Sequence, residues 1–140
     1  MTYDLKKLAI SQTATMPLRD AAGEKQFDAD GKPLSITLYS PAAKQFQQTK
    51  HASEERSSAR MMSKMQGKQD GKITWSDKLE ERAVQLANCT VSFNGFGVDG
   101  LTGHELFKKV YCDIEIGHIA DDVEKFINER SNFMPASTTN

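Results

Sequence analysis

The feature that most constrains the fold is a stretch of 25 residues, 42–66, that contains neither glycine nor proline. Ser40 and Pro41 precede it, and this pair is typical of a helix start, with serine as the N-cap and proline in the first turn. Gly67 follows the stretch and favours the end of a helix. The sequence therefore predicts one helix over residues 42–66, about 37 Å long at 1.5 Å per residue.

This predicted helix has too little apolar surface to lie wholly in a core. Between His51 and Arg60 alanine is the only apolar residue type, and larger apolar side chains return at Met61, Met62 and Met65. We therefore expect part of the helix to project from the domain. Methionine side chains are flexible and recur on surfaces that adapt to other proteins, although they also fill gaps in cores.

The residues before this helix predict an antiparallel hairpin. Apolar and polar residues alternate over 34–39, which is the period of a half-buried strand, and 13–19 alternate more weakly. Turn sequences lie between the two segments. Because two strands alone are marginal in water, we expect a third strand or a cover, with Leu5, Leu8 and Ile10 as the candidates.

Three shorter helices are predicted after residue 74. Thr74 to Asp77 resembles a capping box with aspartate in place of glutamate. Apolar residues at helical spacing follow in three groups. The groups are Leu79, Ala83, Leu86 and Ala87; Leu106, Phe107, Val110 and Tyr111; and Ile119, Val123, Phe126 and Ile127.

The predicted fold class is therefore α+β, an N-terminal antiparallel β-hairpin or small sheet followed by a bundle of about four helices. We expect one domain over residues 1–135, β-rich over 1–40 and helical over 41–134, with a disordered polar tail at 136–140.

Composition excludes several classes of protein. The 18 basic and 19 acidic residues give a net charge of -1, whereas a nucleic-acid-binding protein normally carries a positive excess. No apolar run approaches the roughly 18 residues that span a bilayer, and the first residues lack the pattern of a signal peptide. Two cysteines make no disulfide framework, so we expect a soluble protein of a reducing compartment.

Two short motifs resemble ligand sites, and we interpret both as loops. Residues 95–100 spell G-x-G-x-x-G, with Asp121 about twenty residues further on, but the residues that follow predict helix rather than the second parallel strand of a dinucleotide fold. Residues 28–31 resemble the start of a calcium loop. Counting from Asp28, Pro33 and Tyr39 occupy the positions where an EF-hand needs glycine and glutamate.

Cys89, His104, Cys112 and His118 are the remaining candidates for chemistry. Structural zinc sites usually bring their ligands in close pairs, and these four residues form none. No orienting acid accompanies a cysteine–histidine pair either. We predict no catalytic residue, metal or cofactor, and we keep a small enzyme or metalloprotein as a distant alternative.

Several stretches together resemble the tail assembly chaperones of long-tailed, non-contractile bacteriophages. They cover most of the chain in the expected order, although none is a fingerprint by itself, and the resemblance weakens over 47–64 and 94–103. The stretches are Tyr3-Asp-Leu-Lys-Lys-Leu8, Thr13-Ala-Thr-Met-Pro-Leu-Arg-Asp20, Ile36-Thr-Leu-Tyr-Ser-Pro-Ala-Ala-Lys-Gln-Phe46, Leu86-Ala-Asn-Cys-Thr-Val-Ser-Phe-Asn-Gly95, and Ile116-Gly-His-Ile-Ala-Asp-Asp-Val-Glu-Lys-Phe-Ile-Asn-Glu-Arg-Ser-Asn-Phe-Met134.

The resemblance implies a non-enzymatic protein of the host cell cytoplasm that is not part of the mature virion. Such proteins bind the tape measure protein and help recruit tail tube subunits around it. Self-association remains open as a further interaction. The alternative from another class is a structural minor tail or head–tail joining protein that is retained in the virion.

We expect the partner to contact apolar residues that lie next to flexible chain, because exposed apolar ends can adapt to a client. Phe126 shares a stripe with core positions, so for this residue burial is the favoured interpretation. The predicted partner-binding residues are Met61, Met62, Met65, Phe126, Phe133 and Met134.

Overall fold

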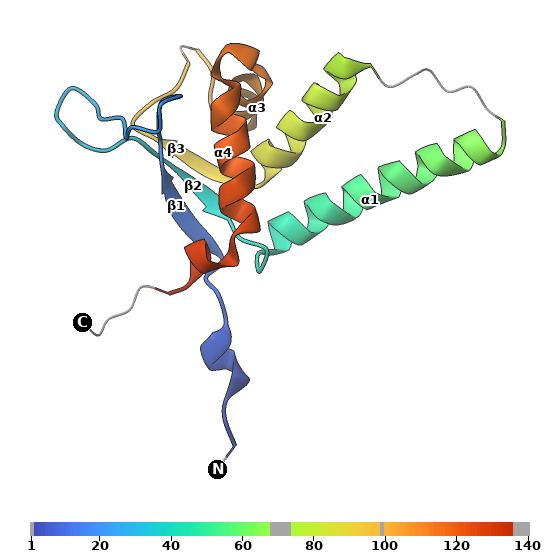
Figure 1. Ribbon diagram of the computed structural model, residues 1–140, viewed down its shortest axis with the longest axis horizontal. Helices are drawn as coiled ribbons and strands as arrows, with labels where there is room; N and C mark the ends of the chain where they lie inside the picture. The colour runs from blue at the N-terminus through green and yellow to red at the C-terminus, as the bar shows by residue number, and fades with distance from the viewer. Residues whose placement is uncertain (1, 68–73, 99, 136–140) are drawn as a thin grey trace.

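The computed structural model (Figure 1) describes residues 2–67, 74–98 and 100–135, so the predicted tail at 136–140 lies outside the described residues. The fold is α+β, as predicted, with a three-stranded antiparallel sheet and four α-helices. The elements are η1 (Leu5–Leu8), β1 (Thr13–Pro17), β2 (Ser35–Tyr39), α1 (Lys44–Met65), α2 (Trp75–Asn88), β3 (Thr90–Asn94), α3 (Gly103–Cys112), η2 (Ile114–Ile116), α4 (Gly117–Asn128) and η3 (Arg130–Phe133).

The sheet has the order β1-β2-β3, and its third strand comes from the helical half of the chain. β2 pairs with β1 on one side and with β3 on the other, with Ile36 opposite both Met16 and Phe93. The expectation that Leu5 and Leu8 cover the hairpin is wrong, because both leucines are exposed, whereas Ile10 is partly buried against the core. β3 supplies the missing third strand instead.

Helices α2, α3 and α4 pack on one face of the sheet and close a single core. All three predicted stripes point into it, with residues of α2, α3 and α4 buried against β2. The largest fully buried side chains include Tyr111, Phe133 and Ile36. On the other sheet face, Asn94 donates hydrogen bonds of 3.0 Å to the Ser35 and Thr37 hydroxyls, so this face is polar.

α1 begins at Lys44, two residues after the predicted start. Ser40 does not cap the helix: its hydroxyl accepts a hydrogen bond from the Ala42 amide within the preceding turn and donates one of 2.6 Å to the Ser11 carbonyl. The helix end at Gly67 is confirmed, since this glycine has a φ of +73°. None of the residues of α1 is buried, and Figure 1 shows the helix running away from the sheet, as predicted.

The start and end of the described domain lie side by side. The Ser11 amide, just before β1, donates a hydrogen bond of 2.7 Å to the carbonyl of Phe133 in η3. Phe133 itself is buried, with its ring edge-on to that of Phe126 at 5.4 Å. The chain therefore enters and leaves the core at one place.

Candidate partner-binding site

The methionine end of α1, defined as Met61, Met62 and Met65, is the most exposed apolar cluster that the sequence predicted. These side chains are 65%, 56% and 79% exposed. They lie at the end of α1 that is farthest from the sheet (Figure 1). Three adjacent exposed methionines are unusual for a monomer surface and are typical of a surface that adapts to a partner.

The methionines are exposed because another face of α1 turns toward the domain. The half-buried residues of α1 recur with spacings of three and four, which is the period of a packed helix seam. They are Phe46, Thr49, Ser53, Arg56, Arg60 and Ser63, so after the first one the seam is polar.

Hydrogen bonds and ion pairs therefore hold α1 against α2. The Gln85 amide donates a hydrogen bond of 2.8 Å to the Ser53 hydroxyl. Both terminal nitrogens of the Arg60 guanidinium donate hydrogen bonds to the carboxylate of Glu81, and Arg56 Nε lies 3.9 Å from the same carboxylate. An interface of this kind contributes less stability than apolar packing, because partly exposed charges keep much of their hydration in the undocked state.

Trp75 is an exposed aromatic residue that sequence reasoning missed. It is the first residue of α2, and its side chain is 69% exposed. Thr74 and Asp77 form the predicted capping box on either side of it, and their reciprocal hydrogen bonds lower the pKa of the Asp77 carboxyl. The signal was present, since a lone tryptophan inside a capping sequence points outward from the first helical turn.

The other predicted residues lie elsewhere and in different environments. Phe133 is fully buried, so its side chain offers no surface to a partner, and Phe126 is half-buried against it. Phe133 looked exposed in sequence because polar chain follows it, but η3 folds its ring back into the core. Met134 is exposed and directly follows η3, a segment on the side of the molecule opposite the methionine end of α1 (Figure 1). The structure thus does not bring the six predicted residues together.

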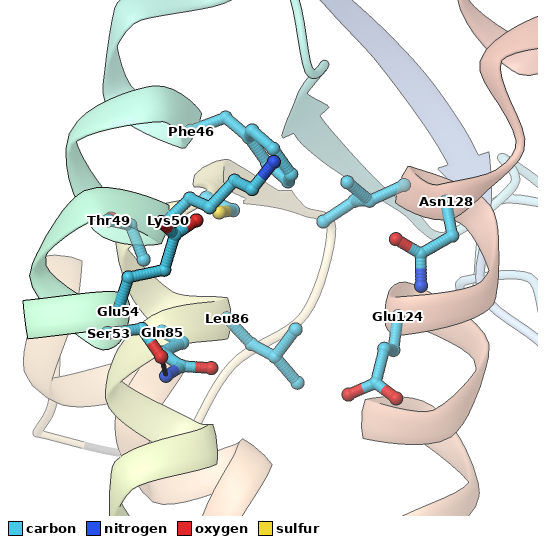
Figure 2. Close-up of a pocket in the computed structure, with 11 residues that line it drawn as sticks. Phe46, Thr49, Lys50, Ser53, Glu54, Gln85, Leu86, Glu124 and Asn128 are labelled. Carbon is cyan, nitrogen blue, oxygen red and sulfur yellow. Dashed lines mark hydrogen bonds between the residues drawn. The ribbon is translucent and has the colours of Figure 1, made fainter. Parts of the chain in front are cut away.

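A groove between α1 and α4 was not predicted. The α1–α4 groove has a volume of about 360 Å³, and Figure 2 shows Leu86 of α2 pointing into it between the two helices. Its apolar lining comes from Phe46, Leu86, Cys89 and Ile127. This lining could not be found from sequence, because its residues come from three helices whose packing is not local.

The rim of the α1–α4 groove carries charge of both signs. Lys50 and Glu54 lie on the α1 wall, and Glu124 lies on the α4 wall (Figure 2). Arg82 binds two carboxylates of α4 at once, Asp121 at 2.6 Å and Glu124 at 3.1 Å. The three charged residues that line the groove, Lys50, Glu54 and Glu124, give its rim an excess of one negative charge.

The cysteines and histidines are separated by the fold. Cys89 is buried, and this burial raises the pKa of its thiol to about 11. His104 Nε2 lies 2.8 Å from the Asn88 side-chain oxygen, whereas His118 Nε2 donates to the Arg19 carbonyl at 3.1 Å. Within residues 2–67, 74–98 and 100–135, no three His, Cys, Asp or Glu side chains come together as metal ligands would.

The two loop motifs occupy sites without the geometry that their ligands need. The G-x-G-x-x-G segment follows a strand of an antiparallel sheet, and Asp121 lies on α4 in contact with Arg82. Asp28 forms a tight turn in which its carboxylate accepts the amides of Asp30 and Lys32, each at 2.9 Å. Asp20 makes the same turn eight residues earlier, a short repeat that sequence reasoning did not find.

Comparisons with protein families, curated proteins and solved structures find no match to this chain. In the described part of the chain, no helix combines the length and the apolar character needed to cross a bilayer.

Proposed function

We propose that this protein is a non-enzymatic tail assembly chaperone of a long-tailed, non-contractile bacteriophage. It binds the tape measure protein in the cytoplasm of the infected cell, helps recruit tail tube subunits, and is absent from the mature virion. The sequence resemblance suggests this function. The observation that carries it is the exposed methionine end of α1, with the exposed Trp75 at the start of the next helix.

The chemistry of this surface suits a helical client. Methionine side chains adapt to varied apolar surfaces, and a tryptophan adds a large rigid contact of the kind that dominates binding energies. A long client needs many weak contacts of low specificity rather than one shaped pocket. The client's apolar stripes would then pack against Met61, Met62, Met65 and Trp75.

Co-expression with the tape measure protein from the same genome tests the proposal. The wild-type chain should raise the soluble fraction of that client and co-purify with it. Replacing Met61, Met62 and Met65 together by serine should reduce co-purification at least tenfold, because each buried methionine contributes about 1.5–3 kcal/mol. Thermal unfolding should remain unchanged, because these side chains are exposed.

Ile114→Ser is the matched control, since Ile114 is a similarly exposed apolar residue on the separate segment η2. This variant should bind the client as well as the wild type does. A client that stays insoluble with the wild-type chain would refute the proposal. Mass spectrometry of purified virions addresses the alternative, because a structural tail protein would be present there in stoichiometric amount.

A further inference from the structure

The segment before β1 carries large apolar side chains that contact little of the domain. This segment, residues 2–9, is called the N-terminal arm here, and Figure 1 shows it extending away from the sheet. Leu5 and Leu8 are 73% and 68% exposed, and Tyr3 is also exposed. A group of neighbouring exposed apolar side chains, unlike a single one, is typical of an interaction surface.

The two exposed leucines of the N-terminal arm lie on the same side of a short capped turn. The Asp4 carboxylate accepts a hydrogen bond of 3.0 Å from the Lys6 amide and thereby caps the single turn η1. In a 3₁₀ turn the side chains at positions i and i+3 eclipse one another, so Leu5 and Leu8 share one side. The arm thus presents a two-leucine face beside the two lysines, Lys6 and Lys7.

The α1–α4 groove matches this face in size. Its volume of about 360 Å³ is more than twice the roughly 150 Å³ of a cavity that admits a benzene molecule. Two leucine side chains therefore fit, and they would meet the apolar lining formed by Phe46, Leu86 and Ile127.

The charges of the arm and the groove are also complementary. Asp4, Lys6 and Lys7 give the arm an excess of one positive charge, and the groove rim has an excess of one negative charge. Glu54 makes no ion pair with the described residues, so it is available to a lysine of an incoming arm.

We propose that the N-terminal arm of one copy docks in the α1–α4 groove of a second copy. Leu5 and Leu8 enter the groove, and Lys6 and Lys7 face the acidic rim. The arm and the groove are different surfaces, so each copy can bind one neighbour and be bound by another. Such a head-to-tail contact builds open chains, or rings where the rotation between copies closes. This inference does not depend on the proposed client.

Sedimentation equilibrium over a range of concentrations tests the proposal. The weight-average mass of the wild type should rise with concentration beyond that of a dimer. Leu5→Ser with Leu8→Ser should weaken self-association by about 100-fold or more, from the loss of two buried leucines. Both residues are exposed, so this arm variant should unfold at the same temperature as the wild type. Ile114→Ser, exposed but outside both surfaces, should associate normally.

A second variant changes the groove without disturbing the core. Glu54→Lys with Asn128→Lys, two exposed rim positions, turns the excess charge of the rim positive and should also give monomers. When the arm variant and the rim variant are mixed, the intact groove of the first can accept the intact arm of the second. The mixture should therefore form dimers and nothing larger.

A wild type that stays monomeric at every concentration would overturn the proposal. An arm that docks in the groove of its own copy would give this same result. An arm variant that associates as strongly as the wild type would overturn it too. So would a mixture of the two variants that remains monomeric.

Discussion

Glu81→Gln should release α1 from the domain while leaving the core intact. The Glu81 carboxylate forms ion pairs with both arginines of the polar seam, Arg56 and Arg60, and its side chain is 29% exposed. Partly exposed pairs contribute up to about 1 kcal/mol each, so losing the charge should cost about 1–2 kcal/mol of docking free energy. That raises the population of undocked α1 roughly 5- to 30-fold.

Amide hydrogen exchange measures this opening directly. Most of the stability of a helix in a protein comes from tertiary packing, so undocked α1 should fray and lose amide protection. Protection over residues 50–65 should fall about 5- to 30-fold in the variant, while protection in α3 and α4 should not change.

Glu80→Gln is the matched control, because Glu80 is the adjacent residue and bonds Lys108 of α3 at 2.8 Å instead of α1. It should leave the exchange of α1 unaffected. If Glu81→Gln lowers protection in α1 and in the core equally, α1 belongs to the cooperative core and the reasoning about its polar seam fails.

Two further predictions concern the core. Phe133→Ala removes a fully buried ring and should lower the free energy of unfolding in urea by about 3–5 kcal/mol. Met134→Ala, at the exposed next position, should change it by less than about 0.5 kcal/mol, and equal losses would contradict the burial of Phe133. Burial raises the pKa of Cys89 from 9.0 to about 11, so the folded state holds this proton more tightly and stability falls as the pH rises through that range. Between about pH 8.5 and 10.5 the wild type should lose about 1.5–2 kcal/mol more than Cys89→Ala, and parallel pH profiles would contradict this.

The helices of the core could be predicted from the sequence because their signals are local. Each apolar stripe repeats at helical spacing within a short segment, and the predicted residues of α2, α3 and α4 are buried or half-buried as expected. β3 was missed for the opposite reason. It has five residues, and its partner β2 lies some fifty residues earlier, so its identity as a strand depends on non-local pairing.

The candidate sites were predicted less completely. The exposure of the methionines followed from the polar composition of α1. The seam of α1 escaped notice, however, because its regular spacing is occupied by residues such as Ser53 and Arg56 rather than leucines. Periodicity of apolar residues cannot reveal a helix that docks through charge, and it cannot reveal a groove shared by three helices.

The hydrogen bond between Ser11 and Phe133 has a consequence for any polypeptide fused or continued beyond residue 135. η3, which directly precedes residues 134 and 135, lies beside the start of β1 and on the side of the molecule opposite the methionine end of α1 (Figure 1). A fluorescent protein or an additional domain attached after η3 would therefore lie nearer to the N-terminal arm, which we propose to contact a second copy, than to the proposed client surface on α1. The two proposed contact surfaces thus lie at opposite sides of the molecule, and a domain attached next to one of them leaves the other accessible.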